Sequence, residues 1–196
     1  MDLWPAYMQE ARKGTFGTSA LQLRTGKRWH TSLAMVGDRS RELGLNTAFV
    51  QKYSEESRYI IARDITHDLF MSVYDVDTET AIVLRPTLPL NGAELKRVID
   101  VVRKKRLKNL EVRAIGLHAS DQILQGCITK LHSGLKDARL MEADLFGNAI
   151  RHLAMDLKTG SVYDLLLQNR VYGPADLIDN ADMREFESKR SQLTFV

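Results

Sequence analysis

The stretch RYIIARDITHDLFMSVYDVDTETAIVLR, residues 58–85, decides the fold because it holds three short segments rich in strand-forming residues. We predict strands over Arg58–Ile65, His67–Tyr74 and Ala81–Arg85. The polar run Asp75–Thr80 predicts a turn between the last two strands. The sequence therefore indicates a β-sheet in this part of the chain.

The chain that follows alternates helical and extended patterns. Asn91 with Glu94 three residues later forms a capping box, which predicts a helix over Gly92–Arg106. A second apolar stripe predicts a helix over Ser120–His132, and Gly134 is its predicted left-handed stop. Further strands are expected over Leu110–Ile115, Arg139–Leu145, Ala149–Asp156 and Val162–Leu167.

The first fifty residues combine the same kinds of element. Leu3–Lys13 has the pattern of an amphipathic helix, and Ala20–Arg24 and Arg28–Val36 are predicted to pair as a hairpin. Short helices are expected over Arg39–Leu43 and Thr47–Ser54. Mixed hairpins and helices, without strict βαβ alternation, predict an α+β fold in which helices pack on a mixed sheet.

Length and composition place the chain among single globular domains. Its 196 residues are 44% apolar and 27% charged, with a net charge of +3. We expect one α+β domain over residues 1–175 and a segment over 176–196 that is either docked or loose. No apolar stretch reaches the ~18–20 residues of a membrane helix, and no secretory signal is visible. The single cysteine, Cys127, excludes an internal disulfide and fits a cytoplasmic protein.

Several familiar site patterns are incomplete. Gly26-Lys27 lacks the earlier glycine of a phosphate loop, and the run from Asp75 has Pro86 where a calcium loop needs a glutamate. The five histidines show no metal-ligand spacing, so no metal site is predicted. Cys127 lies on an apolar stripe, which favours a packing role.

The first candidate site is the element Gly37-Asp38-Arg39-Ser40-Arg41, which follows the apolar run Thr31–Val36. Gly37 lets the backbone approach a phosphate or other oxyanion, and Arg39 or Arg41 supplies charge-assisted hydrogen bonds. Asp38 is a candidate to cap the following helix, hold a metal or polarise water. The alternative is a plain turn with surface arginines.

The second candidate is a basic run between residues 96 and 108. Its cations outnumber its one acid, Asp100, and they are expected to contact DNA phosphates without reading sequence. The alternative is a solvated helix face whose cations are favoured by the helix macrodipole. The candidate DNA-binding residues are Lys96, Arg97, Arg103, Lys104, Lys105, Arg106 and Lys108.

The Gly37–Arg41 element resembles the turn of the ParB/sulfiredoxin fold, in which a G-x-x-R sequence binds phosphate or nucleotide. Ser40 stands three residues after the glycine here, flanked by Arg39 and Arg41. Within that group the chain resembles the oncogenic-suppression (Osa) family of plasmid fertility-inhibition proteins. The resemblance implies a nucleotide-dependent DNase or ATPase with ATP as candidate cofactor, and it leaves a divalent metal open. Asp38, Arg39 and Arg41 would then be catalytic, and Gly37, Arg39 and Arg41 would bind phosphate.

The resemblance further implies a plasmid-encoded fertility inhibition factor that blocks transfer of DNA or effectors through a type IV secretion system. The Gly37 turn would hold a nucleotide or DNA phosphate, and the basic run would steer DNA towards it. The alternative is a non-enzymatic interaction protein that binds a secretion or coupling component through its charged faces. The sequence leaves open whether the chain is an enzyme.

Overall fold

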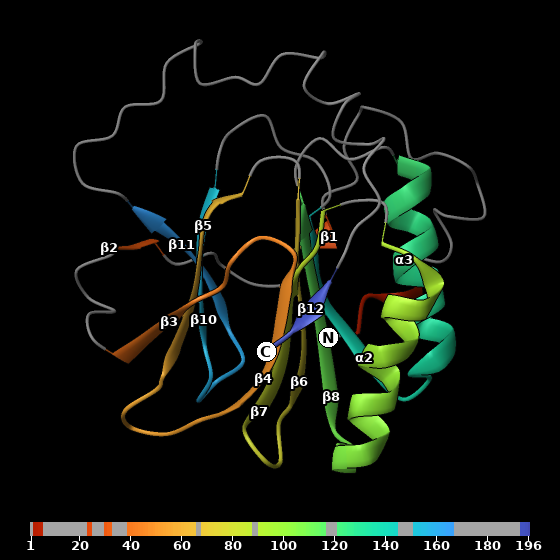
Figure 1. Cartoon of the computed structure of the whole chain (residues 1–196), viewed down its shortest axis with the longest axis horizontal. Coiled ribbons are helices and arrows are strands. Elements are labelled where there is room, and N and C mark those ends of the chain that lie inside the picture. Colours follow the sequence, from red (N-terminus) through yellow and green to blue (C-terminus); the bar gives the residue numbers. More distant parts are fainter. Residues whose placement is uncertain are drawn as a thin grey trace, which may run out of the picture.

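The computed structural model describes residues 2–5, 23–24, 30–32, 39–65, 68–87, 90–116, 121–144, 151–166 and 193–196. These residues form three layers: two helices, a seven-stranded sheet and a five-stranded sheet (Figure 1). The helices are α2 (Gly92–Lys105) and α3 (Asp121–Gly134). Both cover the face of the seven-stranded sheet that is turned away from the five-stranded sheet.

The larger sheet is mixed, with parallel pairs at β8/β9 and β4/β12. Its strands in spatial order are β1 (Leu23–Arg24), β9 (Arg139–Asp144), β8 (Leu110–Gly116), β6 (Leu69–Asp75), β7 (Thr80–Arg85), β4 (Thr47–Lys52) and β12 (Thr194–Phe195). The smaller sheet has parallel pairs at both edges. Its strands in order are β2 (His30–Ser32), β11 (Val162–Leu166), β10 (Arg151–Asp156), β5 (Tyr59–Ile65) and β3 (Ser40–Glu42).

Strand β6 shows why the middle layer is apolar throughout. Leu69, Met71 and Val73 belong to the core under the helices, whereas Phe70 and Tyr74 belong to the core between the two sheets. Alternate side chains of a strand point to opposite faces, so a strand covered on both faces must be apolar at nearly every position. All seven residues of β6 are buried. The predicted α+β class and the β6–β7 turn are thereby confirmed.

Helix α2 is confirmed, including its capping box. The Asn91 side chain accepts a hydrogen bond from the Glu94 N–H at 2.9 Å, and Glu94 accepts one from the Asn91 N–H at 3.0 Å. The predicted left-handed stop at Gly134 is wrong, because Gly134 is the last residue of α3 and its φ is not positive. A Cβ at Gly134 would overlap the side chain of Ile99, so this glycine allows α2 and α3 to approach closely.

Two predicted helices are strands. Residues 40–42 form β3 beside β5, and residues 47–52 form β4 between β7 and β12. Asn46, the predicted helix cap, has a φ of 55° and instead accepts hydrogen bonds from the N–H and hydroxyl of Thr87, both at 2.8 Å. Pairing with neighbouring strands outweighed the local helix signal, because burying Ala48 and Phe49 requires the extended form.

The predicted hairpin of residues 20–36 is also wrong in its described part. β1 pairs with β9 in the larger sheet, whereas β2 pairs with β11 in the smaller one. Of the predicted helix Leu3–Lys13, residues 6–13 lie outside the described residues. Of the segment 176–196, the described residues 193–196 are docked, with β12 against β4.

Among the described residues, neither helix combines the length and the apolarity that crossing a membrane requires. The ParB/sulfiredoxin arrangement within the α+β class stays a prediction.

Candidate nucleic-acid interface

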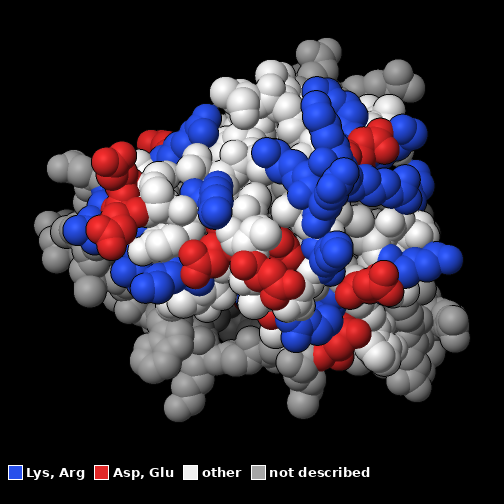
Figure 2. Space-filling model, turned by 90° about the horizontal axis from the view of Figure 1, so that it is seen from below, with Lys and Arg blue, Asp and Glu red and all other residues white. Residues whose placement is uncertain are grey.

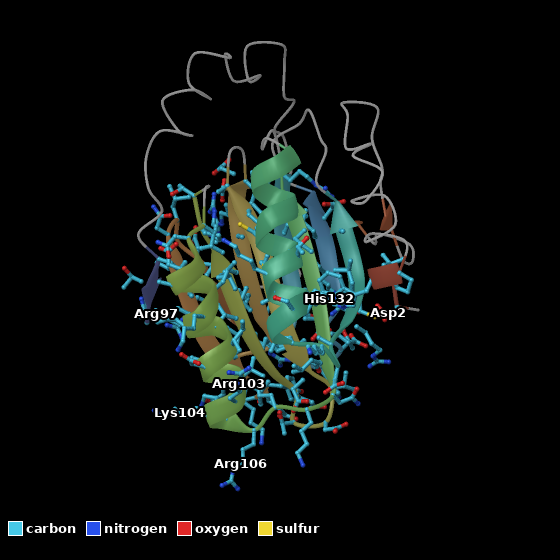
Figure 3. All side chains as sticks on the ribbon, turned by 90° about the vertical axis from the view of Figure 1, so that its right-hand side faces the viewer. Asp2, Arg97, Arg103, Lys104, Arg106 and His132 are labelled. Carbon is cyan, nitrogen blue, oxygen red and sulfur yellow. The ribbon has the colours of Figure 1, made fainter. Side chains whose placement is uncertain are left out.

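Five cations surround the end of α2 and the turn that follows it. Their side chains are exposed, and none makes an ion pair or hydrogen bond with another described side chain. Figure 2 shows Lys and Arg atoms gathered into one patch on this part of the molecule, and Figure 3 shows labelled members pointing outward from α2. We call this patch the basic surface, and it consists of Arg103, Lys104, Lys105, Arg106 and Lys108.

The backbone that carries the basic surface is fixed by specific hydrogen bonds. The buried carboxylate of Asp75, at the end of β6, accepts the N–H groups of Lys108 at 3.2 Å and Asn109 at 2.9 Å. The Leu107 N–H donates to the Val102 carbonyl at 3.1 Å, and the Leu107 side chain is buried. The turn after α2 is therefore anchored to the sheet, which presents its cations in a defined arrangement.

Arg106 occupies an unusual backbone position. It is the C-cap of α2, with a left-handed φ of 56° and ψ of 37°. Glycine is the usual residue near such a helix end because a Cβ makes the left-handed conformation costly. An exposed arginine at this position adds a cation to the basic surface at some cost in backbone strain.

Nearby acids are already engaged by other groups. Asp77 accepts a hydrogen bond from the Asn109 side chain at 3.0 Å. Glu111 binds the guanidinium groups of Arg113 at 2.9 Å and Arg139 at 3.1 Å. The acidic side chains beside the turn thus pair away from the basic surface, leaving its cations to face solvent.

The first two cations of the predicted run have other partners. Lys96 forms an ion pair with Asp100 at 2.6 Å, one helical turn away. Arg97 donates to the Leu193 carbonyl at 3.2 Å, and its guanidinium lies 4.7 Å from the ring centre of Phe195. The predicted DNA-binding run is thus divided, and its cations without a described side-chain partner lie at residues 103–108.

The Gly37–Arg41 candidate is only partly described, because Gly37 and Asp38 lie outside the described residues. Arg39 and Arg41 are both exposed. The Arg41 guanidinium lies 4.1 Å from the ring centre of Phe49 and donates to Gln51 at 3.5 Å. Because residues 40–42 are a strand, no helix begins there to supply the expected cluster of N–H donors.

The two candidate sites are not brought together. β3 is an edge strand of the five-stranded sheet, whereas α2 covers the far face of the seven-stranded sheet (Figure 1). The layers of strands therefore separate Arg39 and Arg41 from the basic surface. Any DNA steered by the basic surface would have to pass around the sandwich to reach the arginines of β3.

Two buried polar groups escaped the sequence analysis. Ser72 on β6 lies directly opposite Arg113 on β8, on the face between the sheets. The Ser72 hydroxyl and Nη1 of Arg113 are both buried, and neither has a hydrogen-bond partner in the described part of the chain. Such groups are normally satisfied by ordered water or a ligand oxygen. The available signal was a polar residue at the central position of each seven-residue strand.

Two ionisable groups have pKa values that their surroundings shift. The bidentate pair of Arg58 with Asp156, at 3.2 and 2.9 Å, raises the Arg58 pKa further above its ordinary value. Burial raises the pKa of the Cys127 thiol, which donates to the Leu90 carbonyl at 3.6 Å. A buried thiol with a raised pKa is a poor nucleophile, so the predicted packing role of Cys127 is confirmed.

In the part of the chain that the structure describes, no three His, Cys, Asp or Glu side chains are grouped so as to hold a metal ion. In comparisons with known proteins, no family model and no curated protein matches the chain. The resemblance to the Osa family therefore depends on the Gly37–Arg41 residues themselves.

Proposed function

We propose that this protein binds nucleic acid through the basic surface, by contacts to phosphates that do not depend on base sequence. One observation carries the proposal: five exposed cations without acidic partners among the described side chains stand on an anchored helix end. Cations arranged in this way displace counterions from DNA, which is the main source of non-specific affinity. The alternative explanation is that the helix macrodipole favours these cations. Fewer cations would be enough to interact with the dipole, and none of them would need to be an arginine in a left-handed cap.

The test is a salt titration of binding to a random-sequence DNA duplex. If all five cations contact phosphates, the plot of log affinity against log salt should have a slope of about −4 to −5. The double substitution Lys104→Glu and Lys105→Glu should weaken binding strongly and reduce the slope by about 2. Lys96→Glu is the matched control, since Lys96 lies on the same helix but outside the basic surface.

A second variant separates affinity from folding. Arg106→Gly removes one cation and relieves the left-handed strain, so it should weaken DNA binding while the thermal midpoint stays equal or rises. No measurable binding of the parent chain at ~50 mM salt would contradict the proposal. That outcome would favour the alternative of a non-enzymatic protein that binds a secretion or coupling component.

The wider proposal is that DNA binding serves fertility inhibition, as the resemblance to the Osa family implies. Transfer through a type IV secretion system would then be blocked in cells that carry the protein. The same resemblance proposes ATP-dependent DNA cleavage at Gly37, Asp38, Arg39 and Arg41. Arg39→Ala and Arg41→Ala should each abolish ATP turnover or DNA cleavage, with the fold checked by circular dichroism. Full activity of both variants would remove this site from the proposal.

A further inference from the structure

The space between the two sheets is apolar in one part and charged in another. Phe49, Phe70 and Val83 fill it along β4, β6 and β7. On the neighbouring strands β8 and β9, the positions that face the same space hold Arg113 and Glu142, both less than one-tenth exposed. Replacing buried charged groups by apolar residues is often neutral or stabilising, so their presence here needs a reason other than stability.

Strand β11 of the smaller sheet adds charge to the same part of the interface. Val162 belongs to the core between the sheets, so Asp164, two residues later on the strand, faces the same way. The Asp164 carboxylate pairs with Arg151 of β10 at 2.6 Å. Because Arg41 of β3 contacts Phe49 of β4, and β5 contacts β6, the two strand orders bring β11 to the side of β8 and β9. The charged part therefore has polar walls from both sheets.

A series of ion pairs leads from the surface into this charged part. Arg139 on β9 has a side chain that is 44% exposed, and it donates to one carboxylate oxygen of Glu111 at 3.1 Å. The other oxygen of Glu111 accepts from Nη2 of the buried Arg113 at 2.9 Å. These three groups carry one net positive charge, and Glu142 beside Arg113 makes a contact of its own. An anion that enters beside Arg139 therefore meets an arginine whose charge Glu111 does not fully neutralise.

Two polar atoms at the inner end of this series have no partner in the described part of the chain. They are Nη1 of Arg113 and the hydroxyl oxygen of Ser72, on residues that stand directly opposite each other on β8 and β6. Ser72 is fully buried, and Arg113 is 7% exposed. A guanidinium nitrogen donates hydrogen bonds and accepts none, and a hydroxyl can donate one. The partner that both groups lack is therefore a hydrogen-bond acceptor, such as an oxygen atom of a ligand.

We propose that Ser72 and Arg113 bind a small oxyanion between the two sheets, either free phosphate or the phosphate or carboxylate group of a small metabolite. The Ser72 hydroxyl and Nη1 of Arg113 donate to its oxygens, and hydrogen bonds between charged partners of this kind are the strong ones. Without the anion, two unpaired buried groups destabilise the fold, and binding satisfies both. The basic surface lies at the end of α2 instead, so the inference is independent of nucleic-acid binding.

The experiment titrates the full chain with inorganic phosphate and, separately, with acetate, at constant pH and ionic strength in a calorimeter. Ser72→Ala removes one donor and adds no bulk. Its matched control is Ser133→Ala, which changes an exposed serine near the end of α3. The double substitution Lys104→Ser and Lys105→Ser tests whether the basic surface binds the same anion. Thermal unfolding followed by circular dichroism shows that each variant is folded, and the anion that binds more tightly identifies the group that the site prefers.

Ser72→Ala should bind the anion about tenfold more weakly than the parent, the effect of about one hydrogen bond to a charged group. Its thermal midpoint without the anion should equal or exceed that of the parent. Arg113→Lys should also weaken binding, because its single nitrogen is needed by Glu111. Ser133→Ala and the double lysine variant should keep the parental affinity. Equal affinities of Ser72→Ala and the parent, loss of binding in the double lysine variant, or no binding of either anion at ~10 mM would overturn the proposal.

Discussion

Among the described glycines, Gly160 is the one with a positive φ. It lies in the turn between β10 and β11 with a φ of 71°, and a Cβ there would overlap the ring of Tyr74. Gly160→Ala should therefore lower the free energy of unfolding by about 2 kcal/mol or more, from left-handed strain and overlap together.

Gly126 provides the control for this prediction. It lies inside α3, and a Cβ there would meet no atom within 4 Å. Gly126→Ala should stabilise the protein by up to about 1 kcal/mol, since alanine is the better helix former. Urea denaturation of both variants checks the pair of predictions. A Gly160→Ala variant as stable as the parent would show that the turn accommodates a side chain.

Tyr74 links the same turn to pH. Its hydroxyl donates to the Lys158 carbonyl at 3.0 Å, and burial raises the Tyr74 pKa to about 12. An unfolded tyrosine ionises near pH ~10, so the folded protein holds this proton more tightly. The stabilisation is complete below about pH 10 and is lost as the pH rises towards about 12.

We therefore expect urea midpoints to fall between pH 10 and 12 more steeply for the parent than for Tyr74→Phe. Removing the hydroxyl also costs about 1 kcal/mol at neutral pH, because the Lys158 carbonyl loses its donor. Tyr163→Phe, at a half-buried position on β11, is the control and should keep the parental slope. Parallel pH profiles for the parent and Tyr74→Phe would show that ionisation of the Tyr74 hydroxyl does not control stability above pH ~10.

At the scale of elements, Glu94 connects the start of α2 to β12. One of its carboxylate oxygens completes the capping box with Asn91, and the other accepts the Leu193 N–H. Asn91→Ala should lower stability by about 1 kcal/mol through loss of the cap. Glu94→Ala should cost more, because it removes the contact to Leu193 as well. Thermal unfolding followed by circular dichroism measures both, and a smaller effect for Glu94→Ala would refute the double role.

The sequence predicted the element whose stabilising contacts are local, and it missed elements whose contacts come from distant strands. The capping box of α2 was predictable because all its atoms lie within four residues of chain. β3 and β4 were not, because their hydrogen-bond partners lie on β5, β7 and β12. Asn46 carries the same side chain that a helix cap needs, but a partner forty-one residues away uses it. The local sequence around Asn46 cannot reveal that Thr87 will donate to its side chain.

At the scale of the whole molecule, the interface between the two sheets encloses a polar group that the described residues do not satisfy. Ser72 is fully buried, and its hydroxyl has no hydrogen-bond partner among the residues that the structure describes. Ser72→Ala should leave stability unchanged or raise it by about 1 kcal/mol, because it removes an unpaired buried hydroxyl. Urea denaturation checks this. Destabilisation by more than about 1 kcal/mol would instead reveal a bound water or ligand that the hydroxyl holds.

The candidate sites also contain features that neighbouring residues predict and features that depend on distant contacts. The basic surface could be predicted because its cations are close in sequence and an amphipathic helix must turn them outward. The loss of Arg97 from that surface depends on Phe195, which only the folded chain places beside it. The separation of Arg39 and Arg41 from the basic surface likewise depends on the stacking order of the layers.

By itself the sequence determined the α+β class, the capped helix α2 and its exposed cations, because local propensity and apolar periodicity act over a few neighbouring residues. Only the tertiary structure decided the two-sheet arrangement, the strands at residues 40–42 and 47–52, and the burial of Ser72 and Arg113. These features depend on which distant strands pair and which faces they cover. Hydrogen bonds between remote segments, and the apolar area they bury, set that choice.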